Sequence, residues 1–270
     1  MRAPFRYLPF LTSLILLAAC SPAPSENEPS NFSVPPNGEP ASGIAFVSER
    51  DGNKEIYLIQ TDGSGLTRLT NDPDIDADPT WSPDGRQIAF RSRRDATTDI
   101  FIMNADGSHQ TNMIRDPEGS KFDEFYPSWS PDGGSFALIT DRFEFGGCSW
   151  HTVALMPVSG GMKNIQHIDT ITGNQRSVAW SPDGRFLAFS NSCGQTDAIS
   201  LYSWERDSSE VQRLTHHKSQ NIYPSWSHDG RFLAFTSIRD GNAEIYQLEL
   251  ATGTLTNLTN HPAKDIFPTW

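Results

Sequence analysis

The stretch that decides the fold is Trp81-Ser82-Pro83-Asp84-Gly85-Arg86-Gln87-Ile88-Ala89-Phe90. Variants of it begin at Trp129, Trp180 and Trp226, and a further tryptophan, Trp270, ends the sequence. The steps between these tryptophans are 48, 51, 46 and 44 residues. A period of roughly 40–50 residues is typical of the four-stranded blades of a β-propeller.

Each repeat carries the signals of short strands joined by tight turns. In Ser-Pro-Asp-Gly, proline presets φ, aspartate bonds nearby backbone N–H groups and glycine tolerates positive φ, so a hairpin turn is predicted after each tryptophan. Apolar runs at 55–59, 99–103 and 244–248 follow, and Asp62-Gly63 predicts the next turn. We expect the first strand of each unit, which ends at the tryptophan, to lie closest to the propeller axis.

The repeats predict an all-β fold, a five-bladed β-propeller of four-stranded antiparallel blades. Residues 43–70 supply only three strands, and residues 265–270 resemble the missing one, so the first blade is expected to be closed by the C-terminal strand. A truncated six-bladed ring is the alternative. Complete units are expected at 79–115, 127–168, 179–215 and 225–259.

Residues 1–19 have the features of a signal peptide, because a charged leader precedes an apolar run at 10–17. Leu17-Ala18-Ala19-Cys20 resembles a bacterial lipobox, which implies cleavage before Cys20 and lipidation of its thiol. An ordinary secretory signal that happens to contain a cysteine is the alternative. Acyl chains would anchor the protein to a membrane. By resemblance to Gram-negative lipoproteins, Ser21 favours the periplasmic side of the outer membrane.

Residues 20–42 are predicted to be a lipidated cysteine followed by a disordered tether. The segment from 21 to 42 holds six prolines and three acidic residues but few bulky apolar groups, so it cannot order itself. Residues 43–270 remain as one propeller domain. The formal net charge of −12 argues against a nucleic-acid partner. In an oxidising compartment Cys148 and Cys193 could form a disulfide or stay as two free thiols, and both readings are open.

The units resemble the repeats of TolB-type, WD-like propellers. The shared pattern is Pro-x-Trp-Ser-Pro-Asp-Gly, then Ile/Leu-Ala-Phe, Arg-Asp-Gly, Ile-Tyr and Leu-Thr, and it covers nearly all of residues 43–270. Because TolB-like proteins dock onto peptidoglycan-associated lipoproteins of the envelope, the resemblance implies a protein partner. The pattern is altered at 141–147 and 192–194, in neighbouring blades, where a specific contact is therefore expected.

Five polar residues lie three positions before the first-strand proline or its equivalent. Because the first strands are expected near the axis, these residues are predicted to circle one mouth of the central channel. An acidic ring there could attract a cation, an amine or a basic peptide end. A solvated rim without a ligand is the alternative. The five residues are Asp76, Glu124, Gln175, Asn221 and Asp265.

Other charged residues recur with the architecture, and we expect them to be structural. Arg-Asp pairs in the loop after the second strand should fix that hairpin. His217 and His261 leave separate outer strands, so they are not expected to share a metal ion. The aspartates of the Ser-Pro-Asp-Gly turns are expected to make turns rather than to bind ligands. These sets are Arg50-Asp51, Arg94-Asp95 and Arg239-Asp240, and Asp84, Asp132, Asp183 and Asp229.

The sequence holds no Gly-x-Ser-x-Gly, phosphate loop or His-Glu-x-x-His motif, so we predict no catalytic residue, no metal and no cofactor. We expect a non-catalytic, membrane-anchored envelope protein that binds a protein or peptide partner through its loop face and channel mouth. Repeats of this type also resemble those of oligogalacturonate lyases, which use a histidine-rich metal site. A carbohydrate-active enzyme, or a sugar- or cation-binding surface protein, is therefore the alternative.

Overall fold

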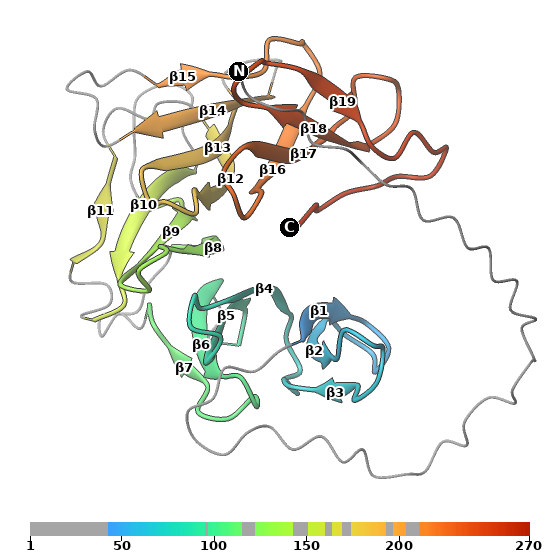
Figure 1. The fold of residues 1–270 in the computed structure, drawn as a ribbon. Coiled ribbons are helices and arrows are strands. Elements are labelled where there is room, and N and C mark those ends of the chain that lie inside the picture. Colours follow the sequence, from blue (N-terminus) through green and yellow to red (C-terminus); the bar gives the residue numbers. More distant parts are fainter. Residues whose placement is uncertain are drawn as a thin grey trace, which may run out of the picture. The chain divides into compact units, whose positions relative to one another are not determined.

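The computed structural model describes residues 43–94, 97–114, 122–142, 151–159, 164–168, 174–192, 197–203 and 211–270. Over these residues the chain forms five antiparallel sheets, each built from strands that follow one another in the sequence (Figure 1). No helix within the described ranges is long and apolar enough to cross a bilayer.

Four of the sheets have four strands each. The second sheet consists of β4 (Asp76–Trp81), β5 (Gln87–Ser92), β6 (Asp99–Asn104) and β7 (Thr111–Asn112). The third consists of β8 (Glu124–Trp129), β9 (Ser135–Thr140), β10 (Thr152–Pro157) and β11 (Gln166–His167). The fourth consists of β12 (Asn174–Trp180), β13 (Phe186–Ser192), β14 (Asp197–Ser203) and β15 (Gln212–Arg213). The fifth consists of β16 (Asn221–Trp226), β17 (Phe232–Ser237), β18 (Glu244–Glu249) and β19 (Leu255–Asn257).

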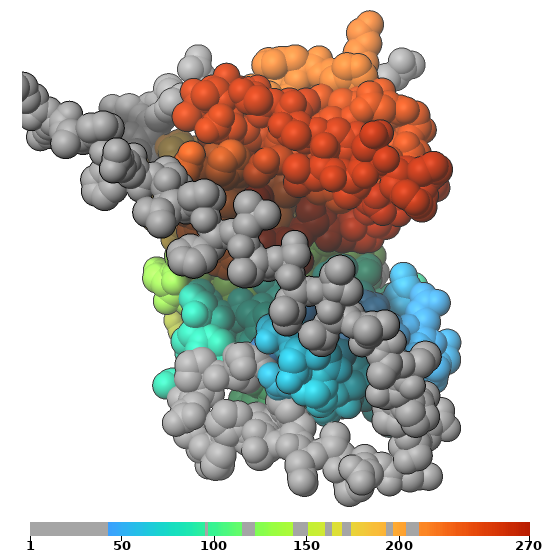
Figure 2. Space-filling model, turned by 45° about the vertical axis from the view of Figure 1, so that its right-hand side comes forward, coloured from blue at the N-terminus to red at the C-terminus, as the bar shows by residue number. Residues whose placement is uncertain are grey.

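Successive sheets pack through their first strands. The strands β4, β8, β12 and β16 contact one another in chain order, and each also contacts the later strands of the preceding sheet. This arrangement is that of propeller blades, and the prediction of a five-bladed β-propeller is confirmed. Figure 2 shows the fifth blade, in red, as a closely packed surface.

The Ser-Pro-Asp-Gly segments form the predicted turns between first and second strands. In the second blade the Ser82 hydroxyl donates to Asp84 Oδ1 at 2.7 Å, and the backbone N–H of Gln87 donates to Ser82 Oγ at 3.0 Å. Gly85 closes the turn at a φ of 68°, which a side chain would strain. The same serine-to-aspartate bond forms in the next three blades, so the prediction that these aspartates make turns is confirmed: it joins Ser130 to Asp132, Ser181 to Asp183 and Ser227 to Asp229.

The hydrophobic core lies between the blades. Each of its clusters combines the outer face of one blade with the inner face of the next, as where Ile56 and Leu58 of β2 meet Phe90 of β5. Tryptophans add a polar tie, because the Trp129 indole N–H donates to the backbone oxygen of Thr80 in the preceding blade at 3.3 Å. Apolar residues on both faces of a strand, as in Ile-Ala-Phe, are thereby explained.

The first sheet has only three strands, β1 (Ile44–Ser48), β2 (Glu55–Ile59) and β3 (Thr67–Arg68). Residues 265–270 form no strand and do not pair with β1, so the predicted pairing of the C-terminal strand with the first blade is wrong in this structure. Ile44 is therefore 52% exposed and Trp270 44% exposed.

The final segment lies instead against the fifth blade. The backbone N–H of Asp265 donates to the oxygen of Ala243 at 2.8 Å, and that of Phe267 donates to Thr236 Oγ1 at 3.3 Å. First strands make the same contact with the blade before them, as Gln175 does with the oxygen of His151. The segment therefore takes the place of a first strand on the fifth blade without forming the backbone pairing to β1.

Candidate functional site

The first strands carry a strained residue that the sequence analysis did not single out. In β4, β8 and β16, and in the C-terminal segment, the residue before the proline has a positive φ between 52° and 59°. Such a φ costs a non-glycine residue about 1–2 kcal/mol. A β-bulge in each of these strands accommodates the strained residue. The pairing register shifts between Ala77 and Thr80 in β4, and at the equivalent places in β8 and β16. The residues are Asp78, Tyr126, Tyr223 and Phe267.

Three of these side chains meet, and two of them, Tyr126 and Tyr223, come from blades that are not neighbours. The ring centroids of Tyr126 in β8 and Tyr223 in β16 are 5.7 Å apart, and those of Tyr223 and Phe267 are 4.2 Å apart. Burial, together with the hydrogen bond to Tyr223, raises the pKa of the Tyr126 hydroxyl. In the blade between them the equivalent residue is the smaller Ser177, whose Oγ accepts from the Tyr223 N–H at 3.0 Å. These side chains therefore line the propeller axis.

A cavity of about 370 Å³ opens beside this aromatic group. Its lining comes from the second to fifth blades and includes Phe125, Tyr126 and Tyr223 together with polar groups from the start of β12. The remaining residues that line it are Arg91, Ile139, His151, Asn174, Gln175 and Arg176. Because first strands of three blades contribute, we call this space the channel-mouth cavity.

Positive charge dominates the exposed part of the channel-mouth cavity. Arg176 has 48% of its side chain exposed, and its Nη1 lies 3.9 Å from Asp197 Oδ2. Arg91 is held inside by Asp78, at 2.8 Å between Nε and Oδ2, and its guanidinium lies 5.7 Å from the Phe125 ring centroid. Burial raises the pKa of the Asp78 carboxyl, and Arg91 opposes this rise. The site can therefore offer aromatic faces and one accessible guanidinium.

The predicted ring of polar residues does not present itself to solvent. The side chains of Asp76, Glu124, Gln175 and Asn221 are all 0% exposed, and only Asp265 is partly exposed. Gln175 alone among them lines the channel-mouth cavity. Four of the five residues predicted to circle the channel mouth are therefore buried, and binding of a ligand by these residues stays a prediction. The bulge turns the residue two positions further along toward the axis.

Arginines from the loop after the second strand form ion pairs with two of these buried carboxylates. Arg94 Nη2 lies 2.7 Å from Asp76 Oδ2, and Arg142 Nε lies 3.1 Å from Glu124 Oε1. Arg94 thus ties the hairpin loop to the first strand of its blade, whereas its neighbour Asp95 lies outside the described residues. The aspartates of the other two pairs accept from tyrosine hydroxyls, Asp51 from Tyr57 and Asp240 from Tyr246.

Several predicted residues lie outside the described ranges or remain untested. Cys20, Cys148 and Cys193 belong to segments that the structure does not describe, so lipidation and the disulfide stay predictions. Among the described residues there is no group of three His, Cys, Asp or Glu side chains that could hold a metal ion. The residues that line the axis could have been found from the sequence, because Asp78, Tyr126, Tyr223 and Phe267 each directly precede the proline of the repeat.

Glu124 makes stability depend on pH. Burial raises its pKa to about 7, against the nearby Arg142, so the folded chain holds a proton that the unfolded chain has lost above about pH 4.5. Raising the pH from 5.5 to 8 should therefore lower the free energy of unfolding by about 2 kcal/mol through this group. Denaturant titrations between pH 5.5 and 8 should show this decrease in the free energy of unfolding for wild type and not for Glu124→Gln.

Glu244→Gln is the matched control for this prediction. The Thr259 hydroxyl holds the pKa of Glu244 below its usual value, so this buried carboxylate stays ionised throughout the tested range. Its substitution should change stability by the same amount at every pH from about 5.5 to 8. A wild-type slope that persists in Glu124→Gln would contradict the assignment.

Comparison with known proteins agrees with the fold and the repeat pattern. The family model of the TolB beta propeller domain, PD40, matches residues 23–148 and 124–270. An uncharacterized protein of Agrobacterium fabrum is 32% identical over 45% of this chain and 38% of its own length. The Tol-Pal system protein TolB of Geobacter sulfurreducens is 52% identical over 16% of this chain and 10% of its own. The chain thus spans well under half of these curated relatives.

Solved structures show the same architecture. TolB from Acinetobacter baumannii superposes with a TM-score of 0.68 at 22% identity, over 85% of this chain and 55% of that one. An oligogalacturonate lyase in complex with manganese gives 0.56 at 16% identity, over 82% and 63% of the two chains. Identities this low show the fold alone. The two family matches together cover the whole propeller, and the chain belongs to the TolB beta propeller domain family.

Proposed function

We propose that this chain is a non-catalytic, membrane-anchored propeller of the bacterial cell envelope that binds a protein or peptide partner at its channel mouth. The observation that carries the proposal is the channel-mouth cavity, which combines aromatic faces with an accessible arginine. The relatives named as Tol-Pal system proteins support a partner in the envelope and an extracytoplasmic location. Two of its lining residues, Tyr126 and Tyr223, have a positive φ, which supports a functional role because backbone strain collects at binding sites.

The chemistry of the cavity favours an extended segment with an aromatic residue and an acidic group. Phe125 and Tyr223 present ring faces, on which an aromatic side chain gains about 0.5–1.5 kcal/mol beyond area burial. Arg176 can bond a carboxylate through two parallel N–H groups. This preference is opposite to the cation expected for an acidic ring, since the acidic side chains of that ring are buried.

The membrane anchor is part of the same proposal. Cleavage before Cys20 and acylation of its thiol would hold the propeller at a membrane surface, with the proline-rich segment as a tether. Labelling of cells with radioactive palmitate tests this directly. Label should appear in the wild-type protein and be lost in Cys20→Ser, and equal labelling of both would exclude this anchor.

A lyase activity has no comparable support. The similarity to oligogalacturonate lyase extends to the fold at 16% identity, and among the described residues only one histidine, His151, lines the channel-mouth cavity. Its Nδ1 lies 3.2 Å from Asn174 Oδ1 and its ring packs edge-on against Phe125. These contacts describe a positioned side chain of a binding surface.

Site-specific cross-linking tests the binding proposal. The full chain would carry a photoreactive amino acid in living cells in place of Asn174, which lines the channel-mouth cavity, or in place of Arg213 on the outer strand β15 of the same blade. One envelope protein should be captured from the first position and not from the second. That protein, once purified, should bind Arg176→Glu at least about tenfold more weakly than wild type.

Arg213→Glu is the matched control, because it makes the same charge change on the exposed outer strand of the fourth blade. Its affinity for the captured protein should equal that of wild type. Equal capture from both positions, or equal weakening by both substitutions, would mean that the channel mouth is not the binding surface.

A further inference from the structure

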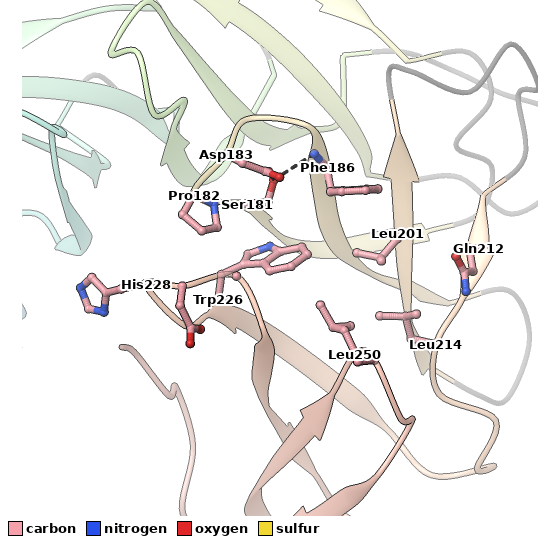
Figure 3. A pocket seen from close by; sticks show the side chains of 13 residues that line it. Ser181, Pro182, Asp183, Phe186, Leu201, Gln212, Leu214, Trp226, His228 and Leu250 are labelled. Carbon is pink, nitrogen blue, oxygen red and sulfur yellow. Dashed lines mark hydrogen bonds between the residues drawn. The ribbon is translucent and has the colours of Figure 1, made fainter. Parts of the chain in front are cut away.

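A second cavity lies between the fourth and fifth blades, where the Ser-Pro-Asp-Gly turns are. Its volume is about 570 Å³, within the range of small-molecule sites. Strand β12 starts at the channel-mouth cavity and ends at this one, so the two lie at opposite ends of the fourth blade. Figure 3 shows Trp226 at its centre, facing side chains from both blades. We call it the turn-side cavity.

The floor of the turn-side cavity is apolar. Phe186 and Trp226 lie nearly parallel, with ring centroids 6.4 Å apart and an angle of 27° between the planes. Leu201, Leu214 and Leu250 surround them, and these leucines are only partly buried members of the core between the two blades (Figure 3). Partly exposed aromatic and aliphatic groups around one hollow can bury an apolar ligand.

Trp226 is less buried than its counterpart in the third blade. In the third blade Trp129 pairs with Phe136, whose ring centroid lies 4.2 Å away, and Trp129 is buried. In the fifth blade Trp226 pairs with Leu233, and Trp226 remains partly exposed. Trp226 therefore presents part of its indole ring to the turn-side cavity.

Two carboxylates stand at the edge of the turn-side cavity. Burial raises the pKa of Asp183, but the Ser181 hydroxyl and the Arg185 N–H outweigh it and leave that pKa below the usual value. The Ser227 hydroxyl and the Arg231 N–H likewise lower the pKa of Asp229. Each aspartate uses Oδ1 in its turn, so Oδ2 is free of the turn hydrogen bonds. Asp229 Oδ2 lies 3.9 Å from Arg231 Nη1.

We propose that the turn-side cavity binds a small organic cation with an aromatic body, of the arylalkylamine class. The ring of the ligand would pack on Phe186 and Trp226, and its ammonium group would lie between Asp183 and Asp229. The aromatic faces attract a cation as well, which adds to the carboxylate attraction. Gln212 and His228 complete the polar edge. This site is independent of the channel-mouth cavity, so either proposal can fail without the other.

Titration with phenethylammonium tests the proposal on the full chain. Chemical shifts of the tryptophan indole N–H groups would be followed by NMR, with Trp226→Phe to assign the signal. Saturable binding in the millimolar range or tighter is expected at the Trp226 signal. Phenylacetate, of similar size but opposite charge, should bind at least about fivefold more weakly, as should the double variant Asp183→Asn/Asp229→Asn toward phenethylammonium.

The repeats supply a matched control. Asp84→Asn/Asp132→Asn makes the same change in equivalent turns of the second and third blades, which do not line the cavity, and its affinity should equal that of wild type. Ala251→Phe, at an exposed lining position, should block binding by filling the space. Absence of saturation, equal binding of phenylacetate, or equal loss in both double variants would overturn the proposal.

Discussion

Replacing Phe90 with alanine is expected to lower the free energy of unfolding by about 3–5 kcal/mol. Phe90 is 0% exposed and belongs to the core between the first and second blades. Its ring packs on Phe101 at 5.7 Å between centroids and under the guanidinium of Arg94. Truncation would remove this apolar area and leave a cavity between two rigid sheets that cannot collapse to fill it. Chemical denaturation followed by circular dichroism measures the loss.

Phe46→Ala is the control for this prediction. Phe46 pairs with Tyr57 as Phe90 pairs with Phe101, so the two phenylalanines hold the same place in successive blades. Phe46 is only partly buried, because no sheet precedes the first one in the described residues. Its truncation should cost about half as much or less. Equal losses would show that packing between blades does not determine the cost.

The second large effect is expected for Arg94→Met. This substitution leaves Asp76, which is 0% exposed, without the guanidinium that lies 2.7 Å from its Oδ2. An uncompensated buried charge of this kind costs about 3–5 kcal/mol. Burial already raises the pKa of Asp76 and Arg94 opposes that rise, so the variant should take up a proton at higher pH. The loss of stability should consequently be smaller at pH 5 than at pH 8.

Arg50→Met separates the ion pair from the other contacts of the arginine. Arg50 bonds Ser48 and lies 4.7 Å from the Tyr57 ring, just as Arg94 bonds Ser92 and lies 4.7 Å from the Phe101 ring. No carboxylate pairs with Arg50 in the described residues. Its substitution should cost no more than about 1–2 kcal/mol, without a pH dependence. A similar cost for both arginines would mean that the buried pair with Asp76 contributes nothing.

This pair of results would also decide what the polar residues of the first strands do. If Arg94 and Asp76 stabilise the fold, substituting either residue will unfold part of the protein, and any loss of ligand binding will then follow from unfolding. Binding experiments on the propeller should therefore vary Arg176 and the axis residues, and leave Asp76 and Glu124 unchanged. The substitution of all acidic ring residues by alanine would confuse unfolding with loss of a partner.

Local features of the fold were predictable from the sequence because they depend on a few adjacent residues. Ser82, Asp84 and Gly85 bond within one turn, so their residue types alone predict it. The spacing of the tryptophans predicts the number of blades for a similar reason, since each repeat forms its own sheet. The burial of Phe90 and its counterparts follows from apolar residues on both faces of a strand.

Which side chains face the axis was decided only by the tertiary structure. Counting along a strand assumes strict alternation, and the bulge at Asp78 and Tyr126 breaks it, so the predicted ring residue became buried and the residue before proline took its place. Arg94 and Arg142 reinforce that choice from loops about 18 residues away. Such pairing depends on how two strands meet, which no single segment encodes.

The repeat pattern by itself determined the strands, the turns and the five sheets of this protein, because backbone propensity and apolar alternation act over a few residues. Contacts between blades decided the rest. They left the last segment on the fifth blade rather than beside β1, buried the acidic side chains of the first strands, and left a cavity beside Trp226 between the fourth and fifth blades. Each of these outcomes depends on the volumes and charges of groups that lie far apart in the chain.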